Sequence, residues 1–341
     1  MRGGLIAFLF SALSAVGTEA MAQVSAEILS FDDLDGWAED DHAAALDVFR
    51  DTCPDMPEGE WSRLCALADQ GPNARTFFEL FFRPVMFGGS DPALFTGYFE
   101  PELDGSRVRT GRFRYPVYRL PPEVTGLWRT RREIEESGVL EGRGLEIAWV
   151  DDAVELFFLQ IQGSGRIRLA DGSVIRVGYG GRNGQEYRSV GQELVRRGIY
   201  QPHQVSAQVI GNWVRRNPDA GRELLYTNPS YVFFREISTR RPEDGPLGAM
   251  NRSITTMRTI AVDPEFTPLG APVWIEKDGE TPLRRLMIAQ DTGSAIRGAQ
   301  RADIFYGTGD AAGREAGRIR DPGRMIVLLP IEIANLAAPE A

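Results

Sequence analysis

Apolar residues recur at helical spacing in the N-terminal part of the chain. Within residues 40–87 they follow the period of an amphipathic helix in segments 43–49 and 61–68. An aromatic-rich run at 77–82 comes next, and Pro84 ends it. This periodicity predicts a helical region over residues 40–87, with the aromatic side chains facing a core rather than a ligand.

Beyond this part the pattern changes to short alternating or wholly apolar runs, which are typical of β-strands. Segments 166–169 and 174–177 flank an Ala-Asp-Gly-Ser turn and predict a hairpin. Two helices are expected among the strands, one from the cap residue Ser189 to Gly198 and one over 205–216. The other expected strands are 94–99, 145–150, 154–162, 231–236, 259–262, 272–276, 284–290, 304–306 and 324–329.

Composition narrows the class of protein. The chain has 341 residues, enough for two domains, and its 43% hydrophobic and 25% charged residues are typical of a globular protein. With a net charge of −10, the chain lacks the excess of basic residues that is typical of nucleic-acid-binding proteins. Lys277 is the only lysine and stands in a Lys-Asp-Gly sequence that predicts a hairpin tip, so lysine chemistry at any other position is excluded.

The first residues have the pattern of a secretory signal peptide. Arg2 gives a positive start, residues 5–16 form a short apolar run, and Ala20-Met-Ala22 fits the small-x-small cleavage rule. We expect cleavage after Ala22, because the apolar run is too short to span a bilayer comfortably. No cysteine lies near this run, so a lipoprotein is not expected and the mature protein should lie in the periplasm.

Cysteine and histidine are scarce. Cys53 and Cys65 are the only cysteines, and in an exported protein such a pair favours a disulfide over two unpaired thiols. His42 and His203 stand alone and are expected at the surface of helical segments. With so few ligand residues we expect no metal site.

The segment from 289 to 309 is the strongest candidate for a functional site. It places Asp291 and Asp303 in a glycine-rich run without His, Cys or Lys. Residues 304–306 predict a strand that would hold Asp303 on a rigid element. Carboxylates at a strand edge beside glycine loops suit acid–base work on a sugar or a peptide. Two β-turns with ordinary surface aspartates are the alternative interpretation.

Several motifs resemble one known family. Residues 290–298 (QDTGSAIRG) and 301–309 (RADIFYGTG) resemble the three-aspartate (3D) domain of the membrane-bound lytic murein transglycosylase A family. Further motifs follow in the family's order, and the resemblance extends from Leu94 to Leu329. These motifs are 95–101 (FTGYFEP), 113–118 (FRYPVY), 158–165 (FLQIQGSG), 177–184 (VGYGGRNG), 228–234 (NPSYVFF) and 245–248 (GPLG).

The resemblance implies a mainly β (α+β) fold, in which a double-psi β-barrel carries N-terminal helices and an inserted β-rich domain. After a signal peptide at 1–22, residues 23–101 would give the helical part and the first half of the barrel. Residues 102–237 would form the inserted glycan-binding domain, and residues 238–335 would complete the barrel as the 3D domain. A groove between the two domains would take the glycan.

The resemblance also implies a peptidoglycan lytic transglycosylase, which cuts the MurNAc-β-1,4-GlcNAc bond and leaves a 1,6-anhydro-N-acetylmuramic acid end. In such an enzyme the sugar's own C6 hydroxyl attacks, so one carboxyl group serves first as acid and then as base. The matching motifs give that role to Asp303, with Asp291 as an essential neighbour. The residues expected to bind substrate are Thr96, Gly97, Tyr98, Gln160, Gln162, Ser164, Tyr187 and Asp310. For the two glutamines, the solvent face of an alternating strand is the alternative.

Two other functions compete with this one. Asp291-Thr-Gly matches the triplet of aspartic proteases, but those enzymes need two aspartates that share a proton, and Asp171-Gly-Ser is expected in a hairpin turn. A peptidoglycan-binding barrel without catalysis is the second alternative. The expected partners are peptidoglycan glycan strands and proteins of cell-wall synthesis or division. We expect a monomer that needs no cofactor.

Overall fold

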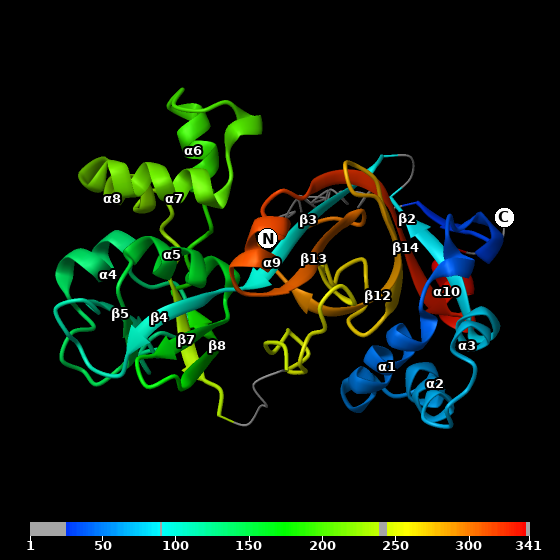
Figure 1. The fold of residues 1–341 in the computed structure, drawn as a ribbon. Coiled ribbons are helices and arrows are strands. Elements are labelled where there is room, and N and C mark those ends of the chain that lie inside the picture. The colour runs from blue at the N-terminus through cyan, green and yellow to red at the C-terminus, as the bar shows by residue number, and fades with distance from the viewer. Residues whose placement is uncertain (1–24, 89–90, 239–243, 339–341) are drawn as a thin grey trace, which may run out of the picture.

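The computed structural model describes residues 25–88, 91–238 and 244–338, and the strands within them form two separate sheets. Figure 1 shows the two sheets at opposite ends of the molecule, each with helices around it. The strands are β1 Ala26–Ile28, β2 Phe82–Phe87, β3 Ala93–Glu100, β4 Glu102–Ser106, β5 Tyr115–Tyr118, β6 Glu146–Val150, β7 Gly165–Leu169, β8 Val174–Arg182, β9 Val232–Glu236, β10 Thr259–Val262, β11 Pro272–Lys277, β12 Leu283–Thr292, β13 Arg301–Thr308 and β14 Arg320–Pro330.

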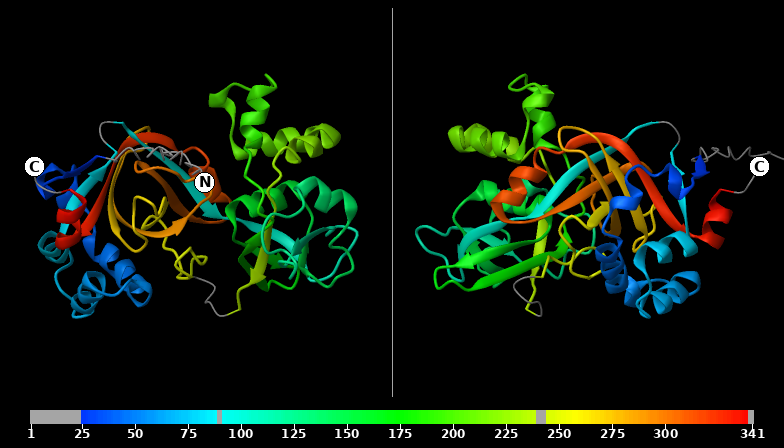
Figure 2. Two further views of the ribbon diagram at one scale, coloured as in Figure 1. Left: turned by 180° about the vertical axis from the view of Figure 1, so that it is seen from behind. Right: turned by 45° about the vertical axis from the view of Figure 1, so that its right-hand side comes forward.

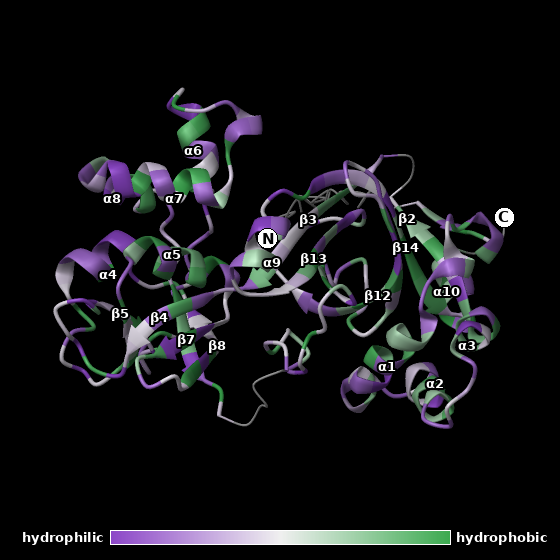
Figure 3. Cartoon of the chain, viewed as in Figure 1, coloured by the Kyte–Doolittle hydropathy of each residue, from purple (hydrophilic) through white to green (hydrophobic). Residues whose placement is uncertain are grey.

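Helices surround both sheets and mix hydrophobic with hydrophilic residues, as Figure 3 shows by colour. No helix in the described ranges is long and apolar enough to cross a membrane. The α-helices are α1 His42–Thr52, α2 Glu60–Ala68, α3 Ala74–Phe81, α4 Arg131–Ser137, α5 Ala153–Gln162, α6 Val190–Arg196, α7 Ala207–Arg216, α8 Pro218–Leu225, α9 Gly309–Ala316 and α10 Ile331–Ala337.

Six strands of the larger sheet close into a barrel. Their order is β14-β11-β12-β10-β13-β3, and β3 pairs back with β14 to complete the ring. The pairs β10–β12 and β13–β3 are parallel, while the other pairs in the ring are antiparallel. Closure leaves no free edge among these strands. The barrel agrees with the barrel-plus-second-β-domain fold that we expected.

The barrel interior explains why these segments become strands. All six residues of β11 are buried, and Trp274 on this strand is fully enclosed. Residues Pro272 to Ile275 are apolar, as expected for a strand buried on both faces, and the two buried charges that follow, Glu276 and Lys277, are paired. Helices α1 to α3 join the same core through an aromatic cluster, which confirms that the aromatic stripe packs inward; its members include Phe49, Phe77, Phe78 and Phe82.

Two expectations for the N-terminal part need correction. The helical region ends at Phe81, and residues 82–87 form β2, because pairing with β14 overrides the helical pattern; Pro84 lies opposite Leu328. His42 is buried rather than exposed, because the cap residue Asp41 places it in the first turn of α1 with its ring against Trp37. The expected signal peptide lies outside the described residues.

The expected disulfide is present. Cys53, just after α1, is bonded to Cys65 in α2, and their Cα atoms lie 5.5 Å apart. The bond joins two short helical segments that are separated by a loop.

The second sheet has the order β5-β6-β4-β7-β8-β9 and uses only strands between Glu102 and Glu236. The expected strand over 154–162 is wrong, because this segment is helix α5. Asp152 caps α5 by accepting a hydrogen bond from the Val154 N–H, and Gly163 ends it at φ 77°. An apolar run of this length does not distinguish strand from helix by periodicity, so the caps decide.

The helices of this second domain follow their sequence signals more closely. Ser189 caps α6 as expected, and α7 ends before Pro218. Pro218 then begins α8, which we did not expect, at the first helical position where proline is well tolerated.

A buried carboxylate joins the two domains where the chain passes from β3 to β4. Glu100 is fully buried, and its Oε2 accepts hydrogen bonds from Arg166 Nε on β7 and from Thr308 Oγ1 on β13, both at 2.8 Å. Arg176 on β8 lies 3.5 Å from the other oxygen. Both views in Figure 2 place this passage between the barrel and the second sheet.

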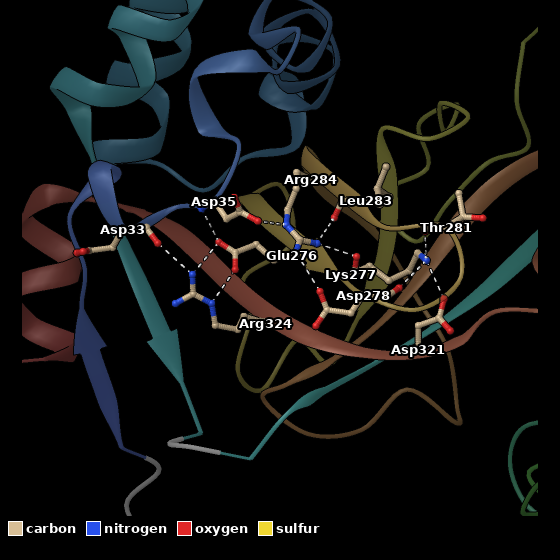
Figure 4. A network of polar contacts seen from close by, with 10 residues as sticks. All are labelled: Asp33, Asp35, Glu276, Lys277, Asp278, Thr281, Leu283, Arg284, Asp321 and Arg324. Carbon is tan, nitrogen blue, oxygen red and sulfur yellow. Dashed lines mark hydrogen bonds and ion pairs between the residues drawn. The ribbon is translucent and has the colours of Figure 1, made fainter.

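A polar network ties the start of the described chain to the barrel (Figure 4). Glu276 on β11 binds Arg324 on β14 at 2.6 Å and accepts the Asp35 N–H at 3.0 Å. The neighbouring Lys277 is buried, and its Nζ donates to Asp321 Oδ2 at 2.7 Å and to the Thr281 carbonyl at 2.6 Å. Lys277 therefore ends β11 at a hairpin, as expected, but its side chain points inward.

Candidate active site

Four neighbouring strands of the barrel place the two candidate aspartates in one row. Ala261 on β10 lies opposite Asp291 of β12 on one side and opposite Asp303 of β13 on the other. Thr96 on β3 lies opposite Asp303 in turn. Residues that face each other across strands project to the same face of a sheet, so these side chains share one surface. Two strand spacings separate the aspartate backbones, which is about 10 Å.

Asp303 is held by one short hydrogen bond. Thr96 Oγ1 donates to Asp303 Oδ1 over 2.5 Å, and Arg301 Nη2 donates to Thr96 Oγ1 over 2.8 Å. Burial raises the pKa of the Asp303 carboxyl above its usual value, while the Thr96 hydrogen bond and the Arg301 charge oppose that rise. A carboxyl group with a raised pKa retains its proton at higher pH than a free aspartate does.

Asp291 has a richer set of donors. Its Oδ1 accepts the backbone N–H groups of Ala249 at 3.0 Å and Thr292 at 2.9 Å, and its Oδ2 accepts the Tyr98 hydroxyl at 3.0 Å. Burial nevertheless raises the pKa of Asp291 to about 6. Burial also raises the pKa of Tyr98 well above its usual value, so this hydroxyl stays protonated and keeps donating to Asp291.

Close backbone packing positions both aspartates. A Cβ on Gly248 would lie 2.7 Å from the Gln290 carbonyl oxygen, so only glycine lets the 245–250 loop approach β12 and place the Ala249 N–H on Asp291. A Cβ on Gly97 would lie 2.7 Å from Ala316 Cα. Gly97, which we expected to bind substrate, therefore lets α9 pack directly on β3.

The residues expected to bind substrate divide into groups. Thr96 and Tyr98 lie with the aspartates, as the hydrogen bonds above show. Gln162 ends α5 and accepts the Phe99 N–H at 3.4 Å, and Ser164 is partly buried between α5 and β7. Gln160 is only 4% exposed and lies near the buried Tyr231, so it is poorly placed to meet a sugar directly.

Tyr187 and Asp310 make no hydrogen bond or ion pair with the two aspartates in the described residues. Tyr187 lines a cavity of about 1040 Å³, together with residues of α6 and with Ala295 from the loop that follows Asp291. Asp310 is exposed in the first turn of α9. Its charge acts on Glu155 and Arg168 of the second domain rather than on Asp303.

The site holds two residues that sequence reasoning missed. Ala249 contributes only a backbone N–H, and Arg301 acts through Thr96. Arg301 lies within the motif at 301–309, and Ala249 directly follows the motif at 245–248. The sequence signal for both was therefore their nearness to a motif rather than their residue type. Within the described ranges, no three His, Cys, Asp or Glu side chains gather where they could hold a metal ion.

The raised pKa of Asp291 makes a testable prediction about stability. Because the folded-state pKa of about 6 exceeds the usual 3.8, the folded state favours the protonated form and loses stability as the pH rises from about 4 to 6. We expect Asp291→Asn to be more stable than the wild type at pH 7, by up to about 3 kcal/mol. The difference should vanish at pH 3.5 in urea unfolding curves, and an equal or lower stability at pH 7 would contradict this account.

The arrangement suits proton transfer without a metal. A buried carboxyl group that is neutral at the start can donate a proton to a leaving oxygen and then take one back. The second carboxyl is fixed by three donors and lies two strands away, so it is placed to shape the site. Neither carboxyl is recorded in a hydrogen bond with the other, which differs from two aspartates that share a proton.

Comparison with known proteins agrees with the sequence motifs. Residues 94–235 match the model of the MltA specific insert domain, and residues 258–329 match the model of the 3D domain. The chain is 34% identical over 285 residues to the membrane-bound lytic murein transglycosylase A of Vibrio cholerae. That alignment covers 80% of this chain and 75% of the relative.

Solved structures have the same fold. The crystal structure of a membrane-bound lytic murein transglycosylase from Agrobacterium tumefaciens superposes with a TM-score of 0.83 at 32% identity, covering 92% of this chain and 99% of the other. A crystal structure of MltA from Escherichia coli with bound chitohexaose superposes with a TM-score of 0.74 at 27% identity, covering 89% and 94%.

Proposed function

Because the chain belongs to the family of membrane-bound lytic murein transglycosylase A, we propose that it cleaves the MurNAc-β-1,4-GlcNAc bond of peptidoglycan and leaves 1,6-anhydro-N-acetylmuramic acid ends. The single observation that carries the mechanism is Asp303, a partly buried carboxyl with a raised pKa on a rigid barrel strand. Within the described residues, no second carboxyl group is hydrogen-bonded to Asp303.

Asp303 would act twice in one turnover. In the first step its proton moves to the oxygen that links C1 of the muramic acid to the next sugar, and the C1–O bond breaks. In the second step the C6 hydroxyl of the same muramic acid attacks C1, and Asp303 takes the hydroxyl proton. The ring closes, and the enzyme returns to its starting protonation without using water as a nucleophile.

Asp291 would organise the site rather than exchange protons. Its three hydrogen bonds join β12, the 245–250 loop and Tyr98 of β3, so it holds three segments around the acid. Its carboxyl also lies near enough for its charge and that of Asp303 to disfavour each other. The negative charge of Asp303 adds to burial in raising the pKa of Asp291, and the three donors oppose that rise.

The relatives also guide the choice of substrate and place of action. The E. coli relative was solved with chitohexaose, a chain of sugars linked like the glycan of peptidoglycan. We propose that the glycan strand passes Asp303 and Tyr98 and continues toward Gln162. Cleavage would take place in the cell envelope, where murein lies, after the protein is exported by the expected signal peptide.

The chemical identity of the product tests this function. Digestion of purified sacculi should release fragments that end in 1,6-anhydro-N-acetylmuramic acid, because the C6 hydroxyl replaces water as the nucleophile. Mass spectrometry distinguishes these ends from reducing ends, which are heavier by one water. Reducing ends would reject the transglycosylase mechanism, and binding to sacculi without any release would favour the non-catalytic alternative.

A further inference from the structure

Three side chains on β3 and β13 form a continuous chain of hydrogen bonds. Arg301 Nη2 lies 2.8 Å from Thr96 Oγ1, which in turn lies 2.5 Å from Asp303 Oδ1. A guanidinium group can only donate hydrogen bonds, and a threonine hydroxyl carries one proton. In this structure Thr96 donates to Asp303 Oδ1. Arg301 favours that direction, because its guanidinium occupies one lone pair of the Thr96 oxygen and polarises the hydroxyl as a donor.

Arg301 is anchored well enough to favour this direction. Its Nη1 donates to the backbone carbonyl of Leu94 at 3.3 Å and to that of Ala302 at 2.5 Å. In the parallel ladder Arg301 lies opposite Leu94, and Asp303 lies opposite Thr96. Within the described residues, Arg301 and Asp303 form no direct ion pair. The Thr96 hydroxyl is therefore the hydrogen-bonded link between them.

We propose that Arg301 and Thr96 are positioning residues that determine which oxygen of Asp303 carries the catalytic proton, an inference that rests on the function proposed above. With Oδ1 accepting from Thr96, the neutral acid has its carbonyl oxygen at Oδ1 and its O–H bond at Oδ2. Oδ2 then gives its proton to the leaving oxygen, and the same Oδ2 later accepts the proton of the C6 hydroxyl. The proton count of Asp303 is restored after the two steps.

The hydrogen bond at Oδ1 also changes in strength during the reaction. When Oδ2 loses its proton, Asp303 becomes anionic and the Thr96 hydrogen bond becomes charge-assisted. Thr96 and Arg301 both lower the pKa of Asp303 against the effect of burial. Removing either group should therefore raise that pKa further and make the acid slower to release its proton.

We call the hydrogen-bonded chain from Arg301 through Thr96 to Asp303 the relay. Substitutions at Thr96 test it through the rate and its pH dependence together. We expect Thr96→Val to lower kcat on sacculi roughly 10- to 100-fold, because an anionic acceptor loses its donor. The basic limb of the pH–rate profile should move to higher pH, and KM should change little. Thr96→Ser retains the hydroxyl and should restore both the rate and the limb. A rise in KM with an unmoved limb would make Thr96 a sugar contact and overturn the relay.

A double-mutant cycle tests the part played by Arg301. Arg301→Met should lower kcat when Thr96 is present and should lower it clearly less in a Thr96→Val background, because the hydrogen-bonded link is already broken and only the charge of Arg301 still acts on Asp303. Arg318→Met removes an arginine whose side chain is 73% exposed and is the matched control for loss of positive charge. Additive losses would overturn the relay.

Substitutions at Arg301 and the products of the wild type distinguish failure of the relay from failure of the proposed function. If Thr96→Val fails to fold, as shown by its melting curve, Arg301→Met and Arg301→Lys carry the test, since lysine restores a donor and should recover the limb. Failure of the wild type to form 1,6-anhydro ends would reject the proposed function itself. Normal products from the wild type together with additive losses would reject only the relay.

Discussion

Asp303→Asn should nearly abolish the release of soluble fragments from sacculi. Loss of general acid–base catalysis costs about 10²- to 10⁴-fold, and the upper end is expected because one group performs both proton transfers in the proposed mechanism. The amide is isosteric with the carboxyl group and can still accept from Thr96, so the fold and glycan binding should remain. The rate is measured as release of labelled fragments, and binding as sedimentation with sacculi.

A matched substitution separates the role of Asp303 from a loss of charge. Asp171 lies exposed in the turn between β7 and β8, where it accepts the Ser173 N–H. Asp171→Asn removes the same charge far from the barrel row and should retain the wild-type rate. Wild-type-like turnover by Asp303→Asn would require another acid, and Asp291 would then be the first to replace.

Asp321→Ala should cause the largest loss of stability outside the row of Thr96, Ala261, Asp291 and Asp303. It removes the carboxylate that pairs with Lys277, whose side chain is only 2% exposed. Breaking a buried pair leaves an uncompensated charge and costs about 3 kcal/mol or more. For a chain of this size, we expect the melting temperature to fall by about 5–10 °C at neutral pH. The two carbonyl oxygens that still accept from Lys277 limit the loss.

Removing both charges is the control for that prediction. Lys277→Met combined with Asp321→Leu leaves no unpaired charge, so it should be far less destabilising than Asp321→Ala alone. A double variant that is as unstable as the single one would mean that packing around the pair, rather than its charge, determines the effect. Catalysis at 25 °C should be unchanged in the double variant.

The sequence predicts the barrel strands best where most residues of a segment are buried. Segments 259–262, 272–276 and 284–290 are short, mainly apolar runs bounded by turns, and each is part of a strand in the structure. Segment 154–162 has the same appearance but is a helix. The caps Asp152 and Gly163 decide its conformation, and they are weaker signals than a segment in which six of nine residues are apolar.

The site was predictable only where residue type and motif coincide. Asp291 and Asp303 could be chosen because they are carboxylates in a motif. Ala249 could not, since its contribution is a backbone N–H that reaches β12 through tertiary packing. Gln160 shows the opposite error, in which a motif suggests a substrate contact at a side chain that is buried near Tyr231. The motif alone does not reveal this burial.

The order of strands along the chain has a consequence for how the protein matures. The second sheet uses only residues between Glu102 and Glu236, whereas the barrel closes through β14, at Arg320–Pro330 near the C-terminal end. When the chain is made from its N-terminus, the second sheet has all its strands while β2 is paired only with β1 and β3 still lacks β13 and β14. The row of Thr96, Ala261, Asp291 and Asp303 is assembled last. A wall-cutting enzyme built in this order has no cutting site until almost its whole length has been delivered.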